Sequence, residues 1–153
     1  VYIYTLPDYD WWSAELGRPR DPGLFGENLT VSGLDRASVC VGDRYRIGDV
    51  LLEVTSPRIP CSTFAARMGD SQFVKRFMAG KRPGIYCRVL ETGSVKAGVV
   101  IAAEPFNGEQ ITLLELFEGF PHKSVTSADR DRYLSVPAHW KLAAFLKGEI
   151  AKP

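Results

Sequence analysis

The stretch that decides the fold is VLLEVTSPRIPC, residues 50–61. In its first half, Val50, Leu52 and Val54 alternate with other residues, in the period of two that is typical of a half-buried β-strand. Pro57 ends the strand because proline has no N–H to donate, and Pro60 favours extended angles at the residue before it. The pattern predicts a strand that leaves the sheet as a stiff segment and presents a cysteine at its end.

That cysteine, Cys61, is the first candidate functional residue. The cation of Arg58 lies close to it in sequence and favours the thiolate, the form of cysteine that binds metals and attacks electrophiles. The alternative is that Cys61 is a small buried hydrophobic residue, as most free cysteines are. Cys40 and Cys87 lie far apart in strand-like runs, and we interpret both as core residues.

Composition excludes several classes of protein. With 153 residues, 45% hydrophobic and 24% charged, the chain is expected to form one ordinary domain, with or without a small appendage. A net charge of +1 argues against a broad nucleic-acid interface. Three cysteines without a C-x-x-C pair predict a reducing, cytoplasmic location. No signal peptide or membrane-spanning run is visible, so we expect no membrane association.

Strand signals predominate before Glu104 and helix signals after it. Earlier in the chain, helices are predicted over residues 10–16 and from about 71 to 80. Residues 85–90 and 98–103 are predicted to be two strands joined by a turn. The predicted fold is therefore mainly β with α: a β domain over residues 1–108, followed by three short helices over residues 109–153. Such short helices are expected to pack on the sheet or on a partner.

Several catalytic and metal-binding patterns are missing. The two histidines, His122 and His139, lie in the helical block, where surface or interhelical roles are expected. The cysteines are too far apart in sequence for an ordinary zinc site, and no glycine-rich phosphate loop is present. Glu53 and Glu91 are expected on the solvent face of their strands. Several polar side chains remain as possible contacts for an anionic cofactor, each with a solvated surface role as the alternative: Asn28, Arg58, Arg67, Lys75, Lys81 and Arg82.

An ordered series of motifs resembles the MOSC domain, named after the C-terminal domain of molybdenum cofactor sulfurases. The motifs are FGENLT (25–30), VGDR (41–44), IG (47–48), LEV (52–54) and PRIPC (57–61). The segment RPGIYCRVL (82–90) is similar to the corresponding segment of the YiiM-like subgroup. The tail, residues 111–147, resembles the "3-alpha" domain that follows MOSC in that subgroup.

The resemblance implies a β-barrel that binds the molybdenum cofactor, with Cys61 as the protein ligand to the metal. It places Asn28 at the cofactor pocket and makes Arg58, Arg67 and Lys75 candidates for the cofactor's anionic groups. Relatives reduce N-hydroxylated compounds such as hydroxylaminopurines and amidoximes, with electrons from a separate flavin or iron–sulfur protein. Pyridoxal-phosphate binding is attached to the family at domain level, although no lysine here stands out for a Schiff base.

Two alternatives stay open. The chain could be a non-catalytic carrier of the cofactor or of sulfur, or a structural remnant in which Cys61 merely packs. Members of the family also carry further strands and a His-Gly-Gly segment before the position that matches Val1, so we expect the barrel to be incomplete at its N-terminal side. The sequence predicts no oligomeric state.

Overall fold

The computed structural model describes residues 1–119 and 125–149. One six-stranded sheet runs through the molecule in the order β2-β1-β5-β4-β3-β6. The strands are β1 (Tyr2–Thr5), β2 (Leu29–Val31), β3 (Arg44–Ile47), β4 (Val50–Pro57), β5 (Ile85–Glu91) and β6 (Ile101–Glu104). The helices are α1 (Leu6–Glu15), α2 (Ser62–Met68), α3 (Phe73–Gly80), α4 (Leu113–Gly119), α5 (Ser127–Leu134) and α6 (Trp140–Leu146), with a 3-10 turn, η1 (Arg36–Ser38).

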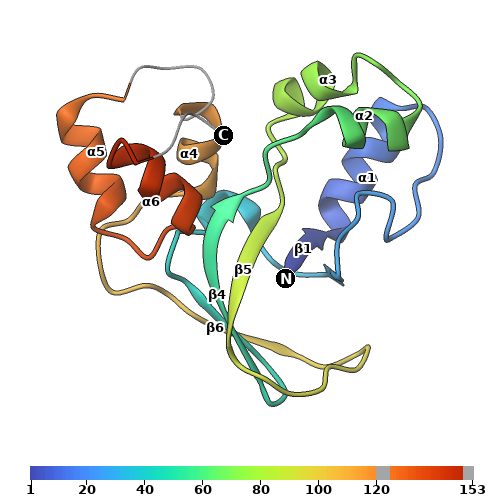
Figure 1. The fold of residues 1–153 in the computed structure, drawn as a ribbon. Helices are drawn as coiled ribbons and strands as arrows, with labels where there is room; N and C mark the ends of the chain where they lie inside the picture. The colour runs from blue at the N-terminus through green and yellow to red at the C-terminus, as the bar shows by residue number, and fades with distance from the viewer. Residues whose placement is uncertain (120–124, 150–153) are drawn as a thin grey trace.

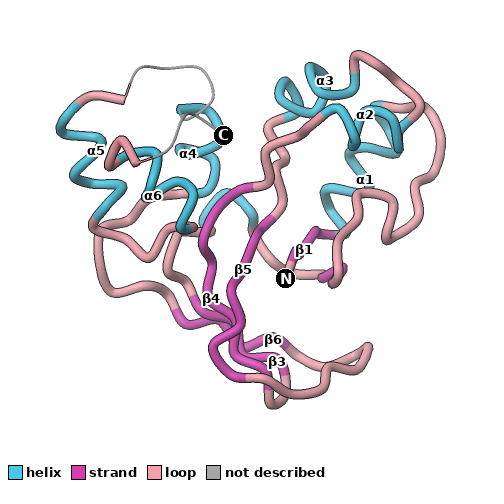
Figure 2. The backbone as a smooth tube through the Cα atoms, viewed as in Figure 1, coloured by secondary structure: helices cyan, strands magenta, loops and turns pink. Residues whose placement is uncertain are grey.

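The sheet is curled and open. β4 pairs antiparallel with both β3 and β5, and β1 joins β5 antiparallel and β2 in parallel. In the described part of the chain, β2 and β6 are the two edges, so the strands form part of a barrel rather than a closed one. The expected mixed fold, with a β-barrel incomplete on one side, is confirmed. Figures 1 and 2 show α1, α2 and α3 on one side of β4 and β5, and α4, α5 and α6 on the other.

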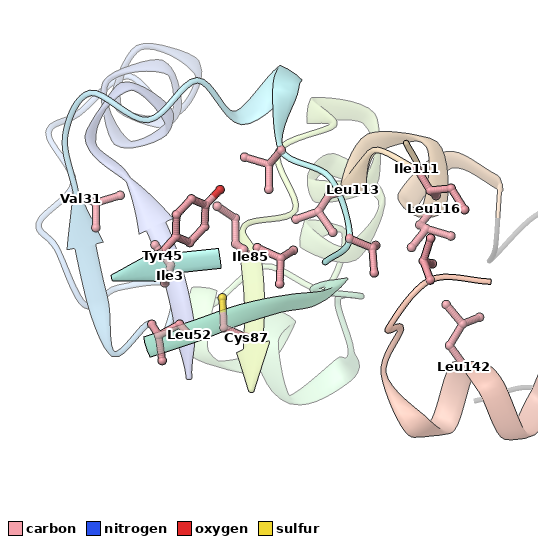
Figure 3. Packing of buried hydrophobic residues seen from close by; sticks show 14 of the residues in the cluster. Ile3, Val31, Tyr45, Leu52, Ile85, Cys87, Ile111, Leu113, Leu116 and Leu142 are labelled. Carbon is pink, nitrogen blue, oxygen red and sulfur yellow. The ribbon is translucent and has the colours of Figure 1, made fainter. Parts of the chain in front are cut away.

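Two buried clusters hold these parts together. The first lies between the sheet and the C-terminal helices, where Leu52 and Ile85 share a core with Leu113, Leu116 and Leu142 (Figure 3). The C-terminal helices therefore pack on the sheet, one of the two arrangements that the sequence predicted. Because one core continues from the strands into these helices, the division between residues 108 and 109 stays a prediction.

The second cluster is almost wholly aromatic. Its fully buried rings come from β1, α1, the loop before β2, α2, α3 and α4: Tyr4, Trp12, Phe25, Phe64, Phe73, Phe77 and Phe117. The rings of Trp12 and Phe77 stack at 5.8 Å between centroids, and most other pairs are tilted or edge-on. This packing fixes α2 against α1 and α3, and so fixes the start of α2, where Cys61 lies.

Several local predictions need correction. The first helix begins at Leu6 rather than at residue 10, because the Thr5 hydroxyl accepts a hydrogen bond from Asp8 N and a proline occupies the first turn. The strand predicted over residues 98–103 is shorter, and it pairs with β3 rather than with β5. Helix α2 lies in a segment with no predicted element.

The expectation that Glu53 faces solvent is wrong. Glu53 is 4% exposed, and its carboxylate accepts hydrogen bonds from Arg44 and from Arg88, at 2.7 Å from Arg88 Nε. Arg88 also donates to the carbonyl of Pro137, so the segment between α5 and α6 lies over this part of the sheet. Glu91 is exposed as expected and pairs with Arg46.

None of the helices in the described ranges combines the length and hydropathy that a membrane span requires.

Candidate functional site

Cys61 lies where the stiff segment after β4 meets α2. Pro57 is the last residue of the strand, Pro60 is buried, and Cys61 occupies the position just before the first turn of α2 in an extended conformation. Its side chain is exposed, whereas Cys40 and Cys87 are buried, as predicted for them. Of the three thiols, only that of Cys61 is therefore presented to a ligand.

The surroundings of Cys61 favour its thiolate. The sulfur makes no capping hydrogen bond of standard geometry, but the nearby N–H of Phe64 lowers the pKa of Cys61. The N–H and hydroxyl of Thr63 and the charge of Arg58 act in the same direction, and they outweigh partial burial, which raises the pKa. By contrast, burial raises the pKa of Cys87 to about 12. Cys61 is thus the thiol best suited to bind a metal as thiolate.

Arg58 joins the cysteine segment to the loop before β2. Its Nη1 donates to the carbonyl of Phe25 at 2.6 Å. Its guanidinium carbon lies 4.2 Å from the ring centroid of Phe64 and 5.2 Å from that of Tyr2. Its Nε is buried without a hydrogen-bond partner. Arg58 therefore holds the loop in place and contributes positive charge near Cys61.

The loop itself is organised by Glu27. Its Oε1 accepts hydrogen bonds from Tyr9 (2.6 Å), the N–H of Gly23 (2.6 Å) and Thr30 (2.8 Å). Burial disfavours the charged carboxylate, but these hydrogen bonds outweigh burial and hold the pKa of Glu27 below its ordinary value. The neighbouring Asn28 is exposed, and its Oδ1 accepts a hydrogen bond from the N–H of Tyr2 at 2.8 Å. The structure therefore shows Asn28 fastening this loop to β1.

The remaining predicted contacts lie elsewhere or are already bound. Arg67 donates to the carbonyls of Gly23 and Leu24, so it braces the same loop. Lys75 is exposed in the middle of α3, and no interaction in the described chain connects it with Cys61 or Arg58. Lys81 pairs with Glu118, and Arg82 pairs with the buried Asp8. Of the predicted residues, the structure brings together Cys61 and Arg58, with Asn28 and Arg67 supporting the adjoining loop.

A pocket of about 660 Å³ lies beside this segment, between β4, β5 and the start of α6. Ile59, two residues before Cys61, forms part of its wall, whereas Cys61 itself does not line it. His139, which was expected at the surface or between helices, lines the pocket and accepts a hydrogen bond from Lys141 N. His122 lies outside the described residues. Sequence reasoning missed the pocket, because its walls come from strands and a helix more than 50 residues apart.

The donor set limits what metal chemistry is available here. No group of three or more His, Cys, Asp or Glu side chains in the described chain is arranged to hold a metal ion. A metal at Cys61 would therefore have one soft protein ligand and would need its other ligands from an organic cofactor. An exposed thiol with a lowered pKa beside a fixed guanidinium fits such a cofactor.

Comparison with known proteins agrees with this geometry. A sequence model of the MOSC domain matches residues 1–102, which include β1 to β5, Cys61 and the loop that holds Asn28. The chain belongs to the MOSC domain family. This family is associated with molybdenum cofactor binding.

Individual relatives show how far the likeness extends. YflK of Bacillus subtilis (strain 168) is 39% identical over 98 residues, which are 64% of this chain and 44% of YflK. A protein of Gibberella moniliformis named reductase is 35% identical over 136 residues, 85% of this chain and 22% of that protein. The chain therefore spans less than half the length of these relatives.

A solved structure shows the same fold. The crystal structure of YiiM from Geobacillus stearothermophilus superposes with a TM-score of 0.89 at 27% identity, over 99% of this chain and 78% of that one. The MOSC fold of this chain is therefore YiiM-like, including the three C-terminal helices. Nothing in the described residues singles out a lysine for pyridoxal phosphate, and that expectation has no support.

Proposed function

We propose that this chain binds the molybdenum cofactor through the Cys61 thiolate and takes part in the reduction of N-hydroxylated compounds. The observation that carries the proposal is the position of Cys61: it is the exposed cysteine, its pKa is lowered, and it lies beside Arg58 at the end of β4. Membership of the MOSC family supports the cofactor. The relative named reductase supports the reaction class.

The cofactor, when bound, would supply two-electron redox chemistry at its metal. The chain's own contribution is positional. The prolines on either side of Arg58 restrict where the thiolate lies, and the guanidinium, held by Phe25 and two rings, places fixed positive charge near it. Cys61 would bind the metal, and Arg58 would face the cofactor's negative charge.

The overall reaction would convert an N–OH group to N–H, consuming two electrons and two protons and releasing water. A separate flavin or iron–sulfur protein would supply the electrons. The pocket beside Ile59 offers space of the size that ordinary small-molecule ligands occupy.

The test is an assay on protein produced in a host that makes the cofactor, with a reduced viologen dye as electron source and an N-hydroxylated purine as substrate. We expect conversion to the amine by the unsubstituted protein and none by Cys61→Ser. Molybdenum bound without turnover would overturn the reductase assignment and favour the alternative of a non-catalytic carrier.

A further inference from the structure

The pocket between β4, β5 and α6 has a one-sided charge. Arg88 and Lys141 are among its lining residues, and no Asp or Glu is found among the described residues that line it. His139 also lines the pocket, but burial and the charge of Lys141 lower its pKa and favour the neutral imidazole. Glu53, which pairs with Arg88, is buried and is not among the described residues that line the pocket. A negatively charged ligand would therefore meet attraction and no opposing carboxylate on the walls of this pocket.

An exposed aromatic ring lies at the same pocket. Trp140 lines it and is 65% exposed, which is unusual for so large an apolar side chain. The Lys141 ammonium lies 5.5 Å from the centroid of the Trp140 ring, so ring and cation are presented together. Tyr86, which also lines the pocket, is 36% exposed, and its ring packs on Tyr2 at 4.9 Å between centroids.

We propose that this pocket binds a planar aromatic ring carrying a negative charge, with Trp140 stacking on the ring and Lys141 attracting the charged group. The inference rests on the proposed function in one respect: the ring is assigned to the substrate, which binds and is released in each turnover, rather than to the cofactor. Two observations favour the substrate. Cys61 does not line the pocket, and the pocket's cations are exposed or already paired, which suits a ligand that enters and leaves.

The pocket also connects with the cysteine segment. Ile59 lies in its wall, and Tyr86 packs on Tyr2, whose ring in turn faces Arg58. A ring bound against Trp140 would therefore lie between α6 and the segment that carries Ile59 and Cys61. Trp140 would be a specificity-determining residue that takes no part in holding the metal.

Adenosine 5′-monophosphate is a suitable probe, with adenosine as the ring alone and ribose 5-phosphate as the charge alone. The chain has three tryptophans, so a ¹H–¹⁵N spectrum contains three indole signals, and Trp140→Phe assigns one of them to Trp140. We expect the Trp140 signal to shift on titration with the nucleotide. The nucleotide should bind more tightly than adenosine, and ribose 5-phosphate most weakly.

Two variants separate stacking from charge. Trp140→Ala should weaken nucleotide binding at least about fivefold, in line with the loss of one base–aromatic stack, and Trp140→Phe should retain most of it. Lys141→Gln should bring the nucleotide's Kd close to that of adenosine. The matched control, Lys147→Gln, removes an exposed lysine at the end of the same helix and outside the pocket, and should change neither Kd.

Equal Kd values for Trp140→Ala and the unsubstituted protein would overturn the proposal. So would a loss of molybdenum from Trp140→Ala as large as that from Cys61→Ser, because the ring would then belong to the cofactor. Nucleotide binding with no molybdenum in the unsubstituted protein would instead refute the proposed function and leave the ligand class of this pocket standing.

Discussion

The Nη1 of Arg58 lies 2.6 Å from the carbonyl oxygen of Phe25, across 33 residues of sequence. The contact joins the segment that presents Cys61 to the loop that contains the Gly-Glu-Asn motif. Gly26, next to Phe25, has a positive φ of 79°, and a Cβ there would lie 3.7 Å from Arg58 Nη1. Two motifs that are far apart in the chain thus form one local structure around an arginine.

Arg58→Ala should destabilise the protein by about 1.5–3 kcal/mol, the range for losing a hydrogen bond from a charged group. The free energy of unfolding in urea measures the effect. Arg67→Ala is the matched control, since Arg67 donates to the same loop from an exposed position, and it should cost less. Equal losses in the two variants would show that Arg58 has no special role in holding the loop.

Cys61 should react with iodoacetamide much faster than the other two cysteines, with a pH midpoint below that of an unperturbed thiol. A lowered pKa means that the thiolate is present at lower pH, so the reaction profile shifts toward acid. Arg58→Gln should shift the midpoint of the reaction back to higher pH, and Cys61→Ser should abolish the fast phase. Mass spectrometry of peptides labelled at several pH values measures each site, and fast labelling of Cys87 would contradict its burial.

Glu27→Gln should destabilise the native state by about 1–3 kcal/mol at pH 7, because three donors lose a charged acceptor. The pKa of Glu27 is depressed in the folded state, so its charge stabilises the fold above the unfolded carboxyl value of about 4.3. That contribution is lost as pH falls through the folded pKa. Thermal unfolding at pH 7 and pH 3 should therefore show a larger difference between the two proteins at pH 7.

Asp8 is 1% exposed and binds both Arg36 (3.2 Å) and Arg82 (2.6 Å). Asp8→Ala should cost about 3–5 kcal/mol in urea unfolding, because both arginines, each largely buried, lose their partner. Asp10→Asn, an exposed change on the same helix, should be nearly neutral. A cost below about 1 kcal/mol for Asp8→Ala would mean that the arginines find other partners.

The elements with strong local signals were predictable. The alternation of residues 50–55 predicted a strand, and the strand is present as β4. The T-x-x-E sequence at residues 112–115 is likewise a local signal for a helix start, and Thr112 there accepts a hydrogen bond from Glu115 N just before α4. Helix α2 was missed because it has only seven residues and its first turn has no side-chain cap. Glu53 was misplaced because a period of two assigns a face to a residue but does not show that another segment covers that face.

In the candidate site, too, the features with a local sequence signal could be predicted, and those that depend on distant parts of the chain could not. The position of Cys61 at the end of a stiff segment could be predicted, because two prolines lie within four residues of it in sequence. The roles of Asn28 and Arg67 in bracing the loop could not, because each depends on a backbone group more than 20 residues away. The pocket lined by Trp140 depends on how α6 packs against β4 and β5, and no local pattern encodes that contact.

The most direct test of the central claim is the molybdenum content of the purified protein, measured by elemental analysis after production in a host that makes the cofactor. The account predicts about one molybdenum per chain, retained by the neighbouring control Ser62→Ala and lost from Cys61→Ser. Circular dichroism should show that both variants keep the fold. Equal molybdenum in Cys61→Ser and the unsubstituted protein would contradict the assignment of Cys61 as the metal ligand.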